Sequence, residues 1–472
     1  MALELTGKTI TDPLYGNIQL TKLESAIVST PAFQRLHNVK QLGLGHLVFP
    51  SAAYSRFSHS VGASVNADRI LTAIQANSSR KFDDKERQCF RIAALFHDLG
   101  HYPFSHTTEH AVKRFYRDGL YKAVPIDDRQ ALLPITELEP VKTTPTYLGH
   151  EDVGKLVFLE DGDISAAFTE CSIGVTKKDV EEVYLDARLS TIISSDLDCD
   201  RMDYLKRTSL HSGAPYGAVD VDFLISKASI DVNGTFCLSH KATRAADHLL
   251  MSRFYDFMQI PYHKTVASLE WSLEESVLSL LNSGAIDLSE SGVSKMLNDK
   301  TWAYFDDGRL LEKMRAAVLQ PKLNELDNDH LHAVLHRKPA KCVYFWESLV
   351  EAGNNEQPTL EKFLNSAIER ISFEKGIDSR RFCVWKAPFK LSKAGPILQR
   401  RPSSEAGATD EEEQQLIQML GRTDSIARPL IDLTNTVSHH LSKLRYQILR
   451  VYYLPTKDDP PGLIGEIKLA LA

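Results

Sequence analysis

The chain has 472 residues, 43% of them hydrophobic and 25% charged, and its formal net charge is −7. This length exceeds what one hydrophobic core usually holds, so the sequence predicts a soluble globular protein of more than one domain. The mild negative charge argues against a dedicated nucleic-acid-binding protein, although it does not exclude a local basic groove.

Cysteine usage and hydropathy indicate the compartment. The six cysteines are scattered and form no C-x-x-C pair, which is typical of free thiols in a reducing environment. No apolar run approaches the roughly 20 residues that cross a bilayer, and the N-terminus lacks a signal-peptide pattern. We therefore expect a cytoplasmic protein without a membrane partner.

The first hundred residues read as a turn followed by helices. The turn covers 12–17, and helical spacing follows over 18–28, over 33–47, from Arg56 onward and up to His97. Ser58 is the candidate N-cap of the helix that opens at Arg56, and Asp83 or Asp84 is that of the next one.

The middle of the chain contains a long polar stretch. Residues 119–148 hold four prolines, which predicts a loop or lid rather than a helix. Helical patterns resume at His150 and over 190–210. Alternating apolar residues flank Asn233-Gly234 and predict a hairpin over 229–238. Residues 240–281 are again helical.

Beyond about residue 290 the pattern becomes mixed. Strand candidates cover 341–346, 381–385 and 446–454, and they alternate with helices. Residues 401–414 are rich in Ser, Gly and Glu, which predicts a flexible loop. We therefore expect a mainly helical core over 1–285, with a small β-hairpin, and a smaller α+β part over 286–472.

One motif concentrates the chemistry. An apolar run, 92–96, delivers His97 and Asp98 side by side, and Gly100 then ends the helix. Imidazole nitrogen and carboxylate oxygen together suit a borderline-hard divalent ion. A lone His-Asp pair is more often a structural helix end. Two further histidines, His101 and His106, favour a metal site here.

Three other stretches offer metal ligands or acid/base groups. His59 precedes the motif, His150-Glu151 follows it, and an acidic helix comes later. On that helix Asp196, Asp200 and Tyr204 lie four residues apart, hence on one face. An isolated acidic helix face is more often exposed to solvent than part of a metal site. The case for a metal site therefore rests on the order of these stretches along the chain.

That order, His59, then His97-Asp98, then Asp200, is similar to that of the HD-domain metal-dependent phosphohydrolases. Further motifs sharpen the resemblance to one branch, the deoxynucleoside triphosphate triphosphohydrolases, over roughly residues 12 to 265. These motifs are Phe33-Gln34-Arg35-Leu36, Lys40-Gln41-Leu42-Gly43, Val48-Phe49-Pro50, Arg56-Phe57-Ser58-His59-Ser60, residues 97–106, His150-Glu151 and residues 198–204.

The resemblance implies a mainly α fold built on an HD-domain helical core, and it assigns roles by position. The ligands of one divalent ion, whether Mn, Mg, Fe or Zn, would be His59, His97, Asp98 and Asp200. The phosphate side would be lined by His101, His106, His150 and Glu151. Of these, His106 or His150 would be the acid/base group, and Glu151 would orient a histidine. The substrate-binding residues would be Gln41, Leu42, Arg56, Arg201, Tyr204, Arg253, Tyr262 and Lys264, with Gln41 reading the 3′-hydroxyl.

The implied reaction is hydrolysis of a deoxynucleoside triphosphate to deoxynucleoside and tripolyphosphate. Attack at the α-phosphorus requires positive charge around the developing oxyanion, and histidines can protonate the leaving group. The sequence shows no activated-nucleophile motif, which fits direct attack by water. Relatives assemble into dimers or tetramers, so we also expect a homo-oligomer, with a nucleotide activator left open.

The chain departs from the family pattern at several positions. Thr208 stands where an Asp that frames the sugar is usual, and Pro261-Tyr262 stands where Tyr-Gln or Tyr-Tyr is usual. Arg201 replaces a Lys and should keep the phosphate contact. Ser29 and His37 replace the Asp and Arg that read guanine at an activator site, so we expect that site to be absent or altered.

Two alternatives remain. An HD phosphodiesterase or nuclease would act on nucleotides or single-stranded nucleic acid, with a groove formed by Lys241, Arg244, Arg253 and Lys264. A nucleotide sensor with reduced catalysis would require decay of the metal ligands, all of which are present. Base preference and the choice between dNTP control and anti-phage defence are not determined by the sequence.

Overall fold

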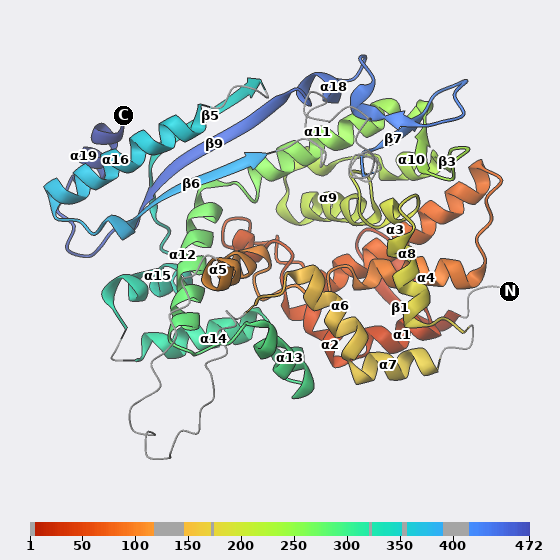
Figure 1. The fold of residues 1–472 in the computed structure, drawn as a ribbon, viewed down its shortest axis with the longest axis horizontal. Coiled ribbons are helices and arrows are strands. Elements are labelled where there is room, and N and C mark those ends of the chain that lie inside the picture. Colours follow the sequence, from red (N-terminus) through yellow and green to blue (C-terminus); the bar gives the residue numbers. More distant parts are fainter. Residues whose placement is uncertain (1–4, 118–145, 171–173, 321–322, 352–355, 390–414) are drawn as a thin grey trace, which may run out of the picture.

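The computed structural model describes residues 5–117, 146–170, 174–320, 323–351, 356–389 and 415–472 (Figure 1). Within these ranges the protein is mainly helical with small sheets, as predicted. No helix among them is long and apolar enough to cross a membrane. Nearly all of the predicted loop over 119–148 and the predicted flexible loop over 401–414 lie outside the described residues, except for 146–148 at the end of the first.

The chain begins with an antiparallel hairpin, β1 (Leu5–Asp12) and β2 (Gly16–Thr21), which is followed by α1 (Lys22–Val28). The prediction of a helix from residue 18 was therefore wrong at its start. Ile18 and Leu20 alternate with exposed neighbours, which is the pattern of a strand. Thr21 then starts the helix through a capping box with Glu24.

The helix predicted over 33–47 is instead a set of short pieces. These are α2 (Pro31–Gln34), η1 (Arg35–Asn38) and η2 (Gly43–Leu47). Val39 is extended and Lys40 forms a β-bridge with Ser55, so the helix cannot continue. Gly43 has a φ of +48°, which further favours a turn at this point.

Two long helices follow, α3 (Arg56–Asn77) and α4 (Asp84–Phe96). The N-cap of α3 is Ser55 rather than Ser58, because the Ser55 hydroxyl accepts the Ser58 N–H. Asp83 caps α4 with Glu86 as its capping-box partner, and His97 is the C-cap at the predicted end of this helix. Helix α3 packs against both α4 and α9.

The next helices are α5 (His106–Arg117), α6 (His150–Glu160), α7 (Gly162–Thr169), α8 (Lys177–Leu185), η4 (Ser190–Ile192) and α9 (Cys199–Ser212). The single helix predicted over 190–210 is thus divided. Asp198 causes the division, because its carboxylate accepts the N–H groups of both Ser195 and Arg201 and so caps α9.

The predicted hairpin is confirmed as β3 (Ala228–Ile230) and β4 (Phe236–Ser239), and it extends into a four-stranded sheet. The added strands are β7 (Gln418–Leu420) and β8 (Arg428–Pro429). Around the hairpin lie η5 (Pro215–Gly217), α10 (Val221–Ser226), η6 (His240–Ala242), α11 (Thr243–Gln259) and α12 (Lys264–Asn282). A break at Ile260–His263, which contains Pro261, divides the helix predicted over 240–281.

The three C-terminal strand predictions are confirmed as β5 (Lys341–Glu351), β6 (Phe382–Phe389) and β9 (Leu444–Tyr453), which form an antiparallel sheet in the order β5-β9-β6. The remaining elements are α13 (Glu290–Asn298), η7 (Trp302–Tyr304), α14 (Asp307–Val318), α15 (Glu325–Leu335), α16 (Gln357–Lys375), η8 (Ser379–Arg381), η10 (Leu430–Asp432), α18 (Val437–Leu441) and α19 (Leu463–Leu471). In Figure 1 this sheet, with α16 and α19, lies at the opposite end of the molecule from the N-terminal hairpin.

The largest hydrophobic core joins segments that are far apart in sequence. It runs from Ile18 to Ile431 and includes Trp302, Phe305 and Leu310 from beyond residue 285. A separate core fills the space between the C-terminal sheet and α16 with α19. The 302–310 segment therefore packs with the helices that carry the candidate site.

Candidate metal centre and adjoining cavity

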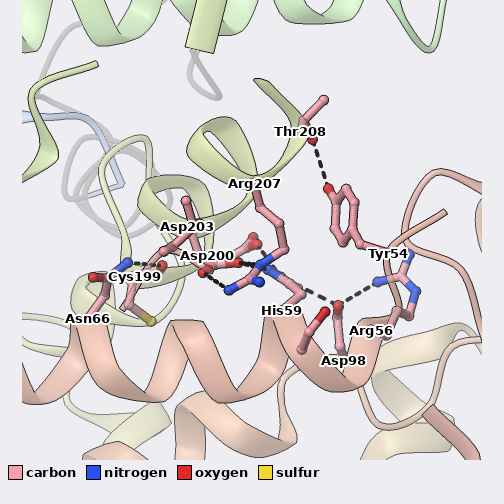
Figure 2. Close-up of polar contacts among 12 residues, drawn as sticks. Tyr54, Arg56, His59, Asn66, Asp98, Cys199, Asp200, Asp203, Arg207 and Thr208 are labelled. Atoms are coloured by element: carbon pink, nitrogen blue, oxygen red, sulfur yellow. Dashed lines mark hydrogen bonds and ion pairs between the residues drawn. The ribbon is translucent and has the colours of Figure 1, made fainter. Parts of the chain in front are cut away.

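The structure brings the four predicted metal ligands together, and Figure 2 shows three of them, His59, Asp98 and Asp200. His59 lies on α3, His97 and Asp98 directly follow α4, and Asp200 lies in the first turn of α9. His59 Nε2 is 2.9 Å from Asp200 Oδ1, 3.2 Å from His97 Nε2 and 3.6 Å from Asp98 Oδ2. His97 Nε2 is 3.5 Å from Asp98 Oδ1 and 3.7 Å from Asp200 Oδ1.

This donor set fits a divalent cation. Two imidazole nitrogens and two carboxylates are typical ligands of borderline-hard ions. The other ring nitrogen of each histidine is occupied, since His59 Nδ1 lies 2.7 Å from Asp203 Oδ2 and His97 Nδ1 lies 2.7 Å from the Ala94 carbonyl oxygen. If those Nδ1 atoms carry the protons, both Nε2 lone pairs are directed at the shared point.

A buried ionic network supports His59 from behind. Arg207 donates to both Asp203 oxygens at 2.8 Å and to Asp12 Oδ2 at 2.7 Å. All three side chains are almost fully buried. Gly62 lies against them, and a Cβ at that position would collide with Asp203 and Arg207. The motifs do not predict this network, although the i,i+4 spacing of Asp203 and Arg207 is a visible signal.

The electrostatics of the four residues favour positive charge at their centre. Burial would lower the pKa of His59, but the carboxylates of Asp200 and Asp203 raise it to about 10. Burial would raise the pKa of Asp200, yet hydrogen bonds to His59 and His97 hold it below its usual value. Two carboxylates in the same field are the environment that a bound cation requires.

Arg56, a predicted substrate-binding residue, lies in the cavity wall and is hydrogen-bonded to two neighbouring side chains. Its guanidinium bonds Asp98 Oδ2 at 2.5 Å and Ser105 Oγ at 2.8 and 3.0 Å. It faces the cavity but is held by these partners. Phe104 and Ser105 have φ values of 54° and 58°, a costly backbone for residues other than glycine. Asp307 holds this turn by accepting the Phe104 N–H at 2.8 Å.

The three predicted histidines form a second cluster beside the metal centre. Ligand atoms of His101, His106 and His150 lie within 4.8 Å of one another. The His101 and His150 rings stack at 4.2 Å, and His101 Nε2 is 3.1 Å from Asp98 Oδ1. Burial and the positive charge of Arg56 lower the pKa of His101 well below its usual value.

Glu109, which belongs to none of the predicted motifs, hydrogen-bonds two of these histidines. Its carboxylate is 2.9 Å from His150 Nδ1 and 3.3 Å from His106 Nδ1. Among the described residues no hydrogen bond joins Glu151, the residue expected to orient a histidine, to any histidine, and the carboxylate that bonds the two histidines is that of Glu109. The available signal was its position one helical turn after His106 on α5.

Two arginines predicted to bind substrate, Arg201 and Arg253, line the cavity. Arg201 Nη1 is 2.8 Å and Arg253 Nη1 is 3.5 Å from Asp196 Oδ1, which is buried between them. Arg201 comes from α9 and Arg253 from α11, so Asp196 ties the two helices at this point. Tyr204, one turn after Arg201, faces the same space.

The predicted sugar-side residues divide into two groups. Gln41 and Leu42 line the cavity, but Tyr262 and Lys264 do not. Tyr262 packs edge-on against Trp385 with ring centres 5.5 Å apart. Thr208 has its hydroxyl 2.7 Å from the Tyr54 hydroxyl.

A cavity of about 900 Å³ unites these groups. This volume is that of sites that enclose a small organic ligand. Its wall includes most of the predicted site residues, namely Gln41, Leu42, Arg56, His97, Asp98, His101, His106, His150, Glu151, Asp200, Arg201, Tyr204 and Arg253. His59 is fully buried behind the wall.

Comparison with known proteins agrees with this geometry. Residues 56–206 match the HD domain family. The chain is 30% identical over 268 residues to the uncharacterized protein YwfO of Bacillus subtilis, covering 56% of this chain and 53% of that one. It is 31% identical over 220 residues to deoxynucleoside triphosphate triphosphohydrolase SAMHD1 of Danio rerio, covering 44% of this chain and 34% of that one. The chain thus spans about half the length, or less, of these curated relatives.

The fold is also similar to that of a solved protein. The crystal structure of a phosphohydrolase from Bacteroides thetaiotaomicron superposes with a TM-score of 0.65 at 19% identity, covering 95% of this chain and 100% of that one. At this identity the likeness concerns the fold alone. The resemblance seen in the motifs is confirmed by the sequence matches. This chain contains an HD domain at residues 56–206, and its relatives include deoxynucleoside triphosphate triphosphohydrolases.

Proposed function

We propose that this protein is a metal-dependent phosphohydrolase that converts deoxynucleoside triphosphates to deoxynucleoside and tripolyphosphate. The observation that carries the proposal is the convergence of His59, His97, Asp98 and Asp200 at the wall of a cavity that also presents Arg201 and Arg253. A divalent cation held by those four residues would polarise a phosphoryl oxygen and lower the pKa of a bound water.

The arginines give the cavity its affinity for a polyanion. A nucleoside triphosphate carries about four negative charges, which two guanidinium groups in a confined site can partly neutralise. Because Asp196 fixes both arginines, they need little reorganisation when the substrate binds. The side chains therefore orient the phosphate chain along the wall formed by α9 and α11.

The histidine cluster supplies the proton that the leaving oxygen needs. Water attacks the α-phosphorus, the bond to the 5′-oxygen breaks, and that oxygen takes up a proton. Burial would lower the pKa of His150, but its hydrogen bond to Glu109 raises it above the usual value. His150 and His106, both oriented by Glu109, are the acid/base candidates, whereas His101 stays neutral and positions Asp98.

Assembly and regulation are further proposals that extend the resemblance. The motif resemblance implies a homo-oligomer, a dimer or tetramer, and leaves open a nucleotide activator. At the expected activator positions, the Ser29 hydroxyl bonds the Ser25 carbonyl at 2.7 Å and His37 stacks on Phe57 at 3.7 Å. Both side chains are thus engaged within the chain, which supports an activator site that is absent or altered for guanine.

The nuclease alternative finds less support in the cavity. Of the four basic residues expected in its groove, only Arg253 lines the cavity, where it pairs with Asp196. Arg244 instead donates to the Asn435 carbonyl at 2.6 Å. We therefore keep the nucleotide, not a nucleic-acid strand, as the proposed substrate.

The experiment that tests the proposal is product analysis with each dNTP, singly and mixed, in Mn²⁺ or Mg²⁺. Tripolyphosphate and deoxynucleoside are the expected products for at least one dNTP. The His97→Ala variant should lose turnover, whereas the exposed His240→Ala variant, outside the cavity, should keep it. Release of only monophosphate and pyrophosphate would contradict the proposed bond cleavage.

A further inference from the structure

Asp256 is a buried carboxylate that no other feature of the fold explains. It lies in the last turns of α11, is 5% exposed, and lines the cavity one helical turn after Arg253. Its carboxylate has no hydrogen bond or ion pair with any residue that the structure describes. Burial alone raises the pKa of this side chain to about 7.

A second buried carboxylate on α11, Asp247, has a structural role and serves as a comparison for Asp256. Asp247 is 6% exposed, and it accepts the N–H groups of Val437 and Ser438 at 2.9 and 2.8 Å and the Ser438 hydroxyl. Those bonds offset its burial. Asp256 has no such compensation, and the C-terminal end of a helix further disfavours negative charge. Burial of the Asp256 carboxylate therefore lowers the stability of the fold, and no contact with the described residues offsets this loss.

A second acceptor lies in the same wall of the cavity. Gln41 Oε1 is buried and lacks a hydrogen-bond partner among the described residues. Tyr54 links the two positions. Its carbonyl accepts the Gln41 N–H at 3.1 Å, and its phenol is close enough to Asp256 to interact electrostatically with that carboxylate.

Two hydroxyls near Asp256 and Gln41 are already paired with each other. The hydroxyls of Tyr54 and Thr208 bond each other at 2.7 Å. This end of the cavity therefore presents two oxygen acceptors and needs donors, whereas the arginine end presents donors and needs acceptors. A molecule that satisfies both ends carries anionic oxygens at one end and O–H or N–H groups at the other.

We infer that Asp256, with Gln41, accepts hydrogen bonds from donor groups on the nucleoside part of the substrate and so determines substrate specificity. This inference rests on the proposed function for the class of substrate. The donor is either the sugar 3′-hydroxyl or an N–H group of the base. Either group would donate a hydrogen bond to the carboxylate. Substrate analogues that lack one donor or the other distinguish the two.

The test compares Asp256→Leu, which keeps the branched shape and removes both acceptors, with the wild type and with Asp256→Asn. Values of kcat/KM are measured for the four dNTPs and for their 2′,3′-dideoxy analogues. If the 3′-hydroxyl is the donor, wild-type discrimination against dideoxy substrates should fall by about 10- to 100-fold in Asp256→Leu. If the base is the donor, the ratio between bases should fall instead. Asp256→Asn, with one acceptor left, should lie between.

A stability measurement separates this role from a structural one. Asp256→Leu should leave the thermal unfolding midpoint unchanged or raise it, because no protein contact is lost. Asp247→Leu is the matched control, and it should lower the midpoint while leaving both substrate ratios unaltered. Unchanged ratios for the sugar and for the base in Asp256→Leu would overturn the inference.

A binding measurement tests the role of Asp256 even if the proposed reaction is wrong. Calorimetry with a dNTP and with its dideoxy analogue reports the same ratios as dissociation constants. If the wild type released no tripolyphosphate, the proposed reaction would fail. A binding ratio that still changed in Asp256→Leu would support the role of Asp256 on its own.

Discussion

The two ends of the cavity differ in how their polar groups are satisfied. At the metal end, His59, Asp98 and Asp200 have partners, and the Asp203–Arg207–Asp12 network supports them from behind. At the nucleoside end, Asp256 and Gln41 Oε1 lack partners within the described residues. The first end is held in place by contacts within the protein, whereas the second leaves acceptors that, under the proposed function, a ligand would satisfy. The two should therefore respond to mutation in opposite ways.

The largest expected effect is at the metal end. Asp200→Asn removes one carboxylate charge from the centre and should reduce kcat by at least about 1,000-fold, because a contribution of several kcal/mol to transition-state stabilisation is lost. Turnover is measured with Mn²⁺ in excess, and circular dichroism confirms folding. Asp222→Asn, an exposed carboxylate on α10, is the control and should retain activity. Near-normal turnover in Asp200→Asn would remove this residue from the metal site.

The next effect concerns stability. Arg207→Leu leaves Asp203 and Asp12 buried without their shared partner and should lower the free energy of unfolding by about 3 kcal/mol or more. Chemical denaturation measures this change. The two ends differ most in this measurement, since Asp256→Leu should lower the free energy of unfolding very little. A loss below 1 kcal/mol in Arg207→Leu would show that the network does not support the centre.

An intermediate effect is expected at Glu109. Glu109→Gln removes the charge that orients and raises the pKa of His150, and it should reduce kcat by about 100-fold. Its matched control is Glu151→Gln, which should change kcat by less than about threefold because Glu151 bonds no histidine among the described residues. If Glu151→Gln reduced kcat more than Glu109→Gln, Glu151 and not Glu109 would be the residue that orients the histidine.

Much of the metal end was predictable from the sequence because its ligands sit in ordered motifs. His59, His97, Asp98 and Asp200 were named from the sequence, and the structure gathers them. The supporting residues were not, because Asp12 and Arg207 come together only through folding. Glu109 and Asp256 belong to no motif, and their roles depend on what lies across a cavity.

The same distinction holds for the fold. Strands with clear alternation, such as β5 and β9, and the Asn-Gly hairpin were predicted. Residues 18–21 were wrongly assigned to a helix, because Ile18 and Leu20 also fit helical spacing and only pairing with β1 decides between the two. Likewise, the division of 190–210 depends on which N–H groups the Asp198 carboxylate accepts.

The smallest expected effect lies at the nucleoside end. Asp256→Leu should change the free energy of unfolding by no more than about 0.5 kcal/mol in the destabilising direction, since the side chain loses no protein hydrogen bond. Chemical denaturation of Asp256→Leu and of Arg207→Leu compares the loss of unfolding free energy at the two ends of the cavity directly. A destabilisation of Asp256→Leu as large as that of Arg207→Leu would show that the two ends do not differ.

The central claim is that four side chains hold one cation at the wall of the cavity. The most direct measurement is the number of divalent ions bound per chain, determined by elemental analysis of purified protein after dialysis against Mn²⁺. We predict one tightly held ion per chain in the wild type and almost none in a His97→Ala, Asp200→Asn double variant that remains folded. An equal metal content in the two proteins would contradict the assignment of the centre.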